Sequence, residues 1–290
     1  MNTLFKWLSS NKVDVKQSLF CMEHTGIYGK LPAVFISTKT ANLWVEMAVK
    51  IIRSQGVTRG KTDKVDAIRI ATYAMKNVED ANLYVPERPQ LEKIRMLMGS
   101  RDRLITAKVS LGKAAKEVEV YNQAYSKEAL KHVKKSLAAI EKDIANIEKE
   151  LTKVIKSDER LNNLFEVVTS VPGVGKVTAM FLLCFTNEFQ NYNVGKQLAC
   201  YCGVAPFEYT SGSSVRGKTR VHKMANKILK KQLHMGALAA ITYDPELREY
   251  YLRKVAEGKH KMLVINNVRN KMVLRICSVV KRMEPYKKAA

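Results

Sequence analysis

The sequence of 290 residues lacks the marks of several protein classes. Its five cysteines form no CxxC pair, which argues against a structural zinc site, and their odd number argues against a disulfide framework. No stretch approaches the roughly 20 apolar residues that cross a bilayer, and the amino terminus has no apolar signal-peptide core. These absences predict a cytoplasmic protein with reduced thiols and no membrane partner.

Acidic residues are also scarce. The chain has 27 Asp and Glu against 50 Lys and Arg, a net charge of +23. Such a surplus favours a polyanionic partner, because basic side chains displace the counterions condensed on phosphates. We therefore expect nucleic acid to be the partner; a ribosome-associated or merely soluble basic protein is the simpler alternative. Hydrophobic residues make up 46% of the chain, enough for a sizeable core.

Residues 1–90 alternate between strand-like and helix-like segments. The pattern predicts strands at Ser18–Met22 and Asn42–Glu46, helices at Gly29–Ser37 and Met47–Arg53, and a further helix from Asp63. Alternation of this kind is typical of an α/β domain with at least part of its sheet parallel.

Residues 91–160 are predicted to be wholly helical, with only two glycines and no proline. Apolar residues recur at alternating spacings of three and four: Leu130, Val133, Leu137, Ile140, Ile144, Ile147, Leu151 and Val154. This seven-residue repeat predicts a helical hairpin or coiled coil that joins two domains and mediates self-association. An ordinary long helix packed on its own domain is the alternative.

Residues 161–290 are predicted to form a mainly helical domain. The turn Val171–Lys176 resembles a helix-hairpin-helix, in which the amides at a helix start can hold a DNA phosphate; Pro-Gly turns between helices are common, so the signal is weak. A loop rich in glycine and serine is expected at Thr210–Gly217.

Three acids stand apart from the general charge. Glu23 follows a predicted buried strand, where open α/β sheets place their sites. Asp63 and Asp66 are three residues apart at a helix start, so their carboxylates project from one face. Such oxygen ligands suit Mg²⁺, and Lys61 and Lys64 could attract a phosphate to them. The acids could instead stabilise the helix dipole or form a salt bridge.

The predicted loop at Thr210–Gly217 lies in a strongly basic stretch. Glu208 is the only acid between Val204 and Tyr243, against seven cations: Arg216, Lys218, Arg220, Lys223, Lys227, Lys230 and Lys231. A serine hydroxyl there could attack phosphorus while the cations offset the developing charge. The simpler reading is a loop that only grips phosphate. His222 and His234 could act as bases, or be structural.

These segments together resemble the insertion-sequence-110 family of transposases, which includes the Piv-type DNA invertases. The resemblance runs through FCMEHTGIYG, NLWVEMAVKIIRSQGVTRGKTDKVDA, VPGVGKVTA, YCGVAPFEYTSGSSVRGKTRVHKMANKILKKQLHMGALAA and HKMLVINNVRNKM. It covers nearly the whole chain and implies a DNA transposase or recombinase. The family's serine attacks DNA, which implies Ser211, directly before Gly212, as the nucleophile, with Ser213 and Ser214 as alternatives.

The resemblance also implies a RuvC-like (RNase H-type) domain with a D-E-D-D set of metal ligands, a helical insertion, and Mg²⁺, or Mn²⁺, as cofactor. Glu23, Asp63 and Asp66 match the second, third and fourth acids. In relatives a non-coding RNA specifies the DNA sites, and the protein acts as a multimer with sites shared between subunits, which implies a guide RNA and a homodimer or homotetramer here.

The first acid of the set has no match. Only 22 residues precede Glu23, residues 5–12 resemble the helix that follows the first strand, and Asp14 is too close to Glu23. We therefore expect the first strand and its aspartate to be absent. Two alternatives to a transposase follow: a metal-dependent junction nuclease that uses water, and a decayed protein that only binds DNA or RNA.

Overall fold

The computed structural model describes residues 2–39, 42–56, 62–190, 192, 194–212 and 214–287. The chain forms two compact units, Met1–Glu87 and Arg88–Ala290. Within the described ranges, no helix is both long and apolar enough to cross a membrane.

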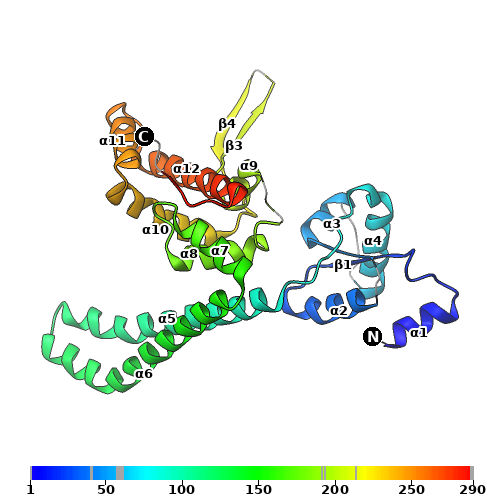
Figure 1. Cartoon of the computed structure of the whole chain (residues 1–290), viewed down its shortest axis with the longest axis horizontal. Helices are drawn as coiled ribbons and strands as arrows, with labels where there is room; N and C mark the ends of the chain where they lie inside the picture. The colour runs from blue at the N-terminus through cyan, green and yellow to red at the C-terminus, as the bar shows by residue number, and fades with distance from the viewer. Residues whose placement is uncertain are drawn as a thin grey trace. The chain divides into compact units, whose positions relative to one another are not determined.

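The first unit is an α/β unit built on two parallel strands (Figure 1). Its elements are α1 (Asn2–Ser10), β1 (Leu19–Glu23), α2 (Ile27–Thr38), β2 (Asn42–Glu46), α3 (Ala48–Ser54), α4 (Asp63–Lys76) and the 3-10 helix η1 (Val78–Asp80). The strands pair in register from Leu19 opposite Asn42 to Glu23 opposite Glu46. The predicted parallel pairing is confirmed, and α2 begins at Ile27 rather than at Gly29.

Helices cover both faces of this sheet, because alternate strand residues point to opposite sides. On one face Trp44 packs with Tyr73 of α4 and Ile51 of α3. On the other, Leu43 packs with Ala33 and Ile36 of α2. The strands therefore have apolar residues on both faces, which explains why they read as short continuous apolar runs.

The strand β1 is less buried than β2. All five residues of β1 are half-buried, whereas Leu43 and Trp44 of β2 are almost fully buried. Among the described residues, β1 pairs only with β2, and β2 has a further bridge from Trp44 to Leu83. The absence of an opening strand stays a prediction.

The second unit begins with two long antiparallel helices, α5 (Pro89–Glu119) and α6 (Gln123–Lys156), which form a hairpin (Figure 1). A turn at Val120–Asn122 separates α5 from α6, and Asn122 caps α6 by accepting hydrogen bonds from two amides. Ion pairs between the helices are Lys93–Glu150, Arg101–Glu148 and Lys108–Glu141. The helices α5 and α6 thus pack along each other, and self-association through this hairpin stays a prediction.

The body of this unit is helical with one β-hairpin. Its elements are α7 (Glu159–Thr169), α8 (Lys176–Thr186), α9 (Gly195–Tyr201), β3 (Phe207–Ser211), β4 (Val215–Arg220), α10 (Lys227–Tyr243), α11 (Pro245–Ala256) and α12 (Lys261–Arg282). The helices share one core, in which the apolar helix α8 is buried along most of its length. The prediction of a mainly helical region is confirmed.

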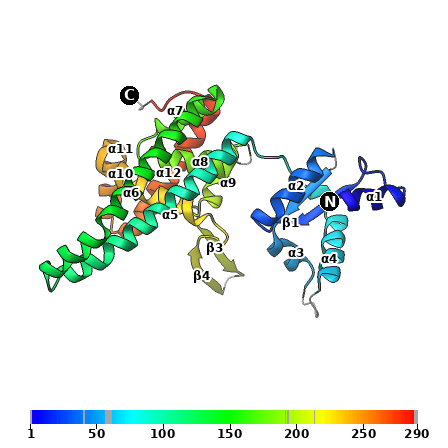
Figure 2. The same ribbon diagram turned by 90° about the horizontal axis from the view of Figure 1, so that it is seen from below.

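The prediction of a loop over Thr210–Gly217 was wrong. Thr210 and Ser211 end β3 and residues 215–217 begin β4 of an antiparallel hairpin, which projects from the helices in both views (Figure 1 and Figure 2). Its polar composition concealed the strands, since both faces are exposed and no apolar alternation marks a buried side. The aromatic Tyr209 packs its ring over Gly217, where a Cβ would lie 2.5 Å from Cδ1 of Tyr209.

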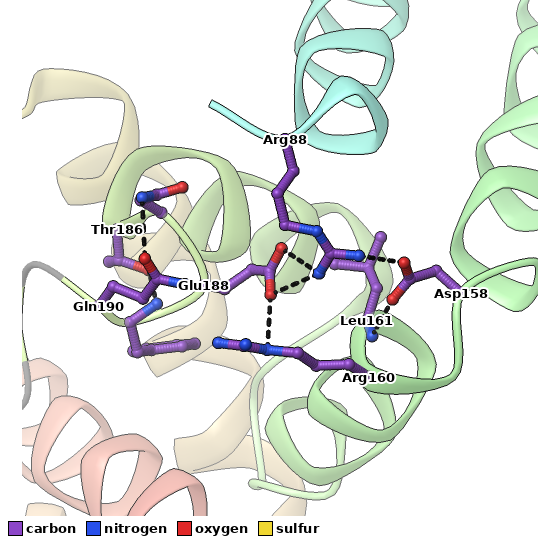
Figure 3. Close-up of polar contacts among 9 residues, drawn as sticks. Arg88, Asp158, Arg160, Leu161, Thr186, Glu188 and Gln190 are labelled. Atoms are coloured by element: carbon purple, nitrogen blue, oxygen red, sulfur yellow. Dashed lines mark hydrogen bonds and ion pairs between the residues drawn. The ribbon is translucent and has the colours of Figure 1, made fainter. Parts of the chain in front are cut away.

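A buried ion cluster holds the start of this unit (Figure 3). Arg88 donates to both carboxylate oxygens of Glu188, at 2.8 and 2.9 Å, and also to Asp158, the N-cap of α7. Arg160 pairs with Glu188 at 2.9 Å. The cluster ties the first turn of α5 to the start of α7 and to the turn after α8.

Candidate active site and nucleic-acid interface

Two glutamates end the two strands of the parallel sheet. Glu23 and Glu46 are register partners, and both lie on the face of Cys21 and Trp44, because alternate residues share a face. That face packs against α4. Glu23 therefore lies at the carboxyl end of β1, as its last residue, on the side of the helix that carries the two candidate aspartates.

Glu46 was missed as a site residue. Its side chain is 7% exposed and accepts hydrogen bonds from Met47 N at 2.7 Å, Lys50 Nζ at 3.2 Å and Tyr73 Oη at 3.4 Å. Burial raises the pKa of Tyr73, and Glu46 raises it further. The sequence contained an indication of this residue, because the second strand, NLWVE, ends in a glutamate just as the first strand, LFCME, does.

The two aspartates lie in the first turn of α4. Thr62 caps this helix by accepting from Val65 N at 3.3 Å, so the capping role does not require either aspartate. Asp66 is half-buried and pairs with Arg69 at 2.9 Å, whereas Asp63 is exposed. The i, i+3 placement at a helix start is confirmed.

The donor chemistry of these acids fits a divalent cation, since Mg²⁺ takes carboxylate oxygens. The three acids are not gathered into one site. In the part of the chain that the structure describes, no three His, Cys, Asp or Glu side chains come together to hold a metal ion. Asp66 is engaged by Arg69 instead. Of the two lysines predicted nearby, Lys64 is exposed and Lys61 lies outside the described residues.

The candidate nucleophile ends a strand of the β-hairpin. Ser211 is the last residue of β3 and pairs with Val215, and its side chain is outside the described atoms. Gly212 follows with φ of +57°, a left-handed conformation that favours glycine. Of the alternatives, Ser214 is exposed in the turn and Ser213 lies outside the described residues.

Cations surround this hairpin. Arg216 and Arg220 project from β4, and Lys223 and Lys227 follow it; all four side chains are exposed. The Lys218 side chain is outside the described atoms. The arrangement is a strongly positive, solvent-facing surface of the kind that attracts a phosphate backbone.

The two candidate histidine bases have different surroundings. His222 lies in the turn after β4, and its Nδ1 accepts from Met224 N at 3.2 Å, so this nitrogen serves the local backbone. His234 lies on α10, and its Nδ1 is buried without a hydrogen-bond partner among the described residues.

The turn at Val171–Lys176 joins the two helices α7 and α8, and its resemblance to a helix-hairpin-helix stays a prediction. Gly173 has φ of +85° and packs against Gly236 of α10. No side chain caps the start of α8, whose N-cap is Gly175, and the next residue, Lys176, is exposed. The turn thus presents amides and a cation at one helix start.

Comparison with known proteins identifies the family. A model described as "Transposase IS116/IS110/IS902 family" matches residues 165–252, and a DEDD-type IS110 transposase model matches residues 1–118. The chain is 23% identical to the pilin gene-inverting protein of Moraxella bovis over 286 residues, 97% of this chain and 86% of that protein. It is 38% identical over 96 residues to a protein of insertion element IS110 from Streptomyces coelicolor, 33% of this chain and 24% of that protein.

The DEDD type of the matched model implies dependence on a divalent metal, and it is consistent with a RuvC-like first unit. The matches cover both candidate sites, since the three carboxylates lie within the match to residues 1–118 and the serine lies within the match to residues 165–252. The chain belongs to the IS110 family of transposases and is, by family, a DNA recombinase.

Proposed function

We propose that this protein cuts and joins DNA strands in insertion-sequence transposition, with the hydroxyl of Ser211 as nucleophile. The observation that carries the proposal is the position of Ser211 at the end of β3 on an exposed, cation-rich hairpin. The following turn is open, because a Cβ built on Gly212 would meet no atom within 4 Å. A DNA backbone can therefore approach this end of the strand.

The proposed reaction has two transfers. The Ser211 oxygen attacks a phosphodiester, the bond from phosphorus to one strand's oxygen breaks, and that oxygen leaves as a hydroxyl with the proton that serine gives up. The hydroxyl of a second strand then attacks the phosphoserine, which restores serine and joins the strands. No bond is hydrolysed overall, so no external energy source is needed.

The exposed cations have two roles in this proposal. Nucleic acid is held by Lys61, Lys64, Lys176, Arg216, Lys218, Arg220, Lys223 and Lys227. Those on and after β4 also offset the negative charge that builds on phosphorus oxygens during each transfer. The second role requires solvent-facing cations on or close to the hairpin. Arg216 and Arg220 meet this requirement, because they are exposed residues of β4.

We assign the divalent metal of the family to Glu23, Asp63 and Asp66, as Mg²⁺ or, alternatively, Mn²⁺. When bound, such an ion polarises a phosphate oxygen and activates a nucleophile. Glu23 is supported by its place at the carboxyl end of β1, on the face that α4 covers. Asp66 must exchange its Arg69 partner for the ion.

The proposal extends to the organisation of the chain. Residues 1–90 act as the nuclease-type domain, 91–160 as a helical linker that associates with further copies in a dimer or tetramer, and 161–290 as the serine-bearing domain. A guide RNA is the expected second nucleic acid, supported by the net charge of +23 over the whole chain.

The test is a strand-transfer assay on the full chain, produced from a plasmid that carries its gene with the flanking DNA. Labelled fragments of that DNA are incubated with the protein, and covalent adducts are separated on a denaturing gel. Ser211→Ala should abolish adduct and transfer, whereas Ser214→Ala, the matched control in the turn that follows β3, should retain both. Asp63→Asn should abolish metal-dependent activity while leaving DNA binding intact.

Three outcomes would contradict parts of this proposal. Cleavage by Ser211→Ala without any adduct would identify a nuclease that uses water. Adduct lost in Ser214→Ala but kept in Ser211→Ala would move the nucleophile. Salt-sensitive binding by the wild type, with neither cleavage nor adduct at any metal concentration, would identify a binding protein only.

A further inference from the structure

In the part of the chain that the structure describes, one arginine of the helical core has no counterion. Arg269 of α12 is only 6% exposed. Its Nε is buried without a hydrogen-bond partner, and among the described residues no carboxylate pairs with its guanidinium. By contrast, Arg88 and Arg275, which are also partly buried, each pair with two acids. Arg269 therefore differs from Arg88 and Arg275, which have carboxylate partners.

The position of Arg269 relates it to the β-hairpin. It lies three residues after Asn266, on the same side of α12. Asn266 Nδ2 donates to Val204 O at 2.8 Å, and the chain from Val204 leads directly into β3 at Phe207. The helix α12 also packs against α9. Asn266 therefore fixes the segment that leads into the hairpin to the side of α12 that also carries Arg269.

A buried guanidinium without a partner is unfavourable for the folded protein. Arginine cannot escape the cost by losing its proton, although burial lowers the pKa of Arg269 from its ordinary value. A methionine of similar length would fill the space without that cost. An arginine without a carboxylate partner among the described residues is therefore explained if its anionic partner belongs to another molecule.

We propose that Arg269 binds a phosphate group of a nucleic-acid backbone where the strand passes the base of the β3–β4 hairpin. Arginine suits this role, since its planar fork can bind two phosphate oxygens at once. The neighbouring stretch offers no competing acid apart from exposed Glu208. The inference rests on the nucleic-acid binding proposed above, and not on the identity of the nucleophile.

This phosphate is distinct from the one that Ser211 attacks. Four residue steps along β3 separate Phe207 from Ser211, about 13 Å at the usual strand rise. Adjacent phosphates along a duplex strand advance by roughly 3.4 Å along the helix axis. Arg269 would therefore hold the backbone several nucleotides from the cut and fix its register on the hairpin.

The test compares Arg269→Met with Lys281→Gln, which removes an exposed cation from the same helix. Without nucleic acid, Arg269→Met should raise the melting temperature by about 2–4 °C, because a buried charge is lost. Its affinity for duplex DNA should fall roughly ten- to a hundredfold at low salt. Its slope of log K against log salt should fall by about 0.9. Lys281→Gln should change none of these measurably.

A second variant and a second ligand complete the experiment. Arg269→Lys keeps the charge but not the fork, so it should restore most of the salt slope and only part of the affinity. Repeating the titrations with single-stranded RNA identifies the strand: a slope change of about 0.7 there, and none with DNA, would assign the phosphate to RNA.

Two results would overturn the inference. One is a lower melting temperature in Arg269→Met with unchanged affinity for both nucleic acids, which is the behaviour of a structural arginine. The other is an equal loss of affinity in Arg269→Met and Lys281→Gln, which would reduce Arg269 to general charge. Failure of the wild type to bind any nucleic acid would instead refute the proposed function.

Discussion

Arg88 and Glu188, 100 positions apart, form an ion pair in which one nitrogen, Nη1 of Arg88, donates to both carboxylate oxygens at 2.8 and 2.9 Å (Figure 3). The Glu188 side chain has no exposed surface. Its backbone is left-handed, as are those of Asn187 and Phe189, with φ of 49°, 54° and 63° along the three residues. Three such residues in succession are unfavourable, so the ion pair and the packing around it must hold this turn.

Replacing Arg88 with methionine should destabilise the second unit by about 2 kcal/mol, because a buried carboxylate then keeps only Arg160. Urea denaturation would measure the loss. Lys113→Met on the same helix α5 is the control; its pair with Glu117 is largely exposed, so we expect about 0.5 kcal/mol or less. Equal effects of the two substitutions would show that the buried pair contributes nothing beyond a surface contact.

Gly173→Ala should be among the most destabilising single-methyl changes in the chain. The new Cβ would lie 2.4 Å from the carbonyl oxygen of Gly236, at a φ of +85°. We expect a loss of about 2–4 kcal/mol in thermal or urea unfolding. Gly112→Ala in α5, where a Cβ meets no atom within 4 Å, should gain about 0.5–1 kcal/mol; a gain at both sites would disprove the close approach.

The phenol of Tyr73 should titrate above its ordinary pKa of 10.0, because burial and then Glu46 raise it. A group whose folded pKa is raised contributes stability below its unfolded pKa and loses it as pH rises through the folded value. The first unit should therefore lose stability above about pH 10. Glu46→Gln should lower the Tyr73 pKa but leave it raised, since burial is the larger cause.

Absorbance of tyrosinate against pH, with Tyr73→Phe to identify the signal, measures this titration. Tyr28→Phe is the control, because Tyr28 is exposed. A Tyr73 pKa unchanged by Glu46→Gln would refute the electrostatic contact between the two side chains.

Cys200 and Cys202 should react very differently with iodoacetamide, although only one residue separates them. Cys202 is completely buried, and burial followed by Cys277 raises its pKa to about 12. Cys200 is half-buried. We expect Cys200 to be alkylated at least roughly tenfold faster at neutral pH, as followed by mass spectrometry. The difference should vanish in denaturant; its persistence there would point to a cause other than burial.

Local patterns in the sequence determined the secondary structure of most of the chain. The short apolar runs at Ser18–Met22 and Asn42–Glu46 predicted a parallel pair, and the seven-residue seam from Leu130 to Val154 predicted the long helix α6. The acid pair Asp63 and Asp66 was correctly placed at a helix start. These features depend on residues close together in the chain, so periodicity and capping suffice to predict them.

Tertiary structure decided what distant residues do to one another. It buried Glu46 in contact with Tyr73, paired Arg88 with Glu188, and gave Arg269 no counterion among the described residues; none of these follows from sequence spacing. The β3–β4 hairpin also escaped prediction, because its strands are exposed on both faces and carry no apolar period. A local pattern records which face of an element is buried, whereas the identity of its partner depends on how the whole chain closes around it.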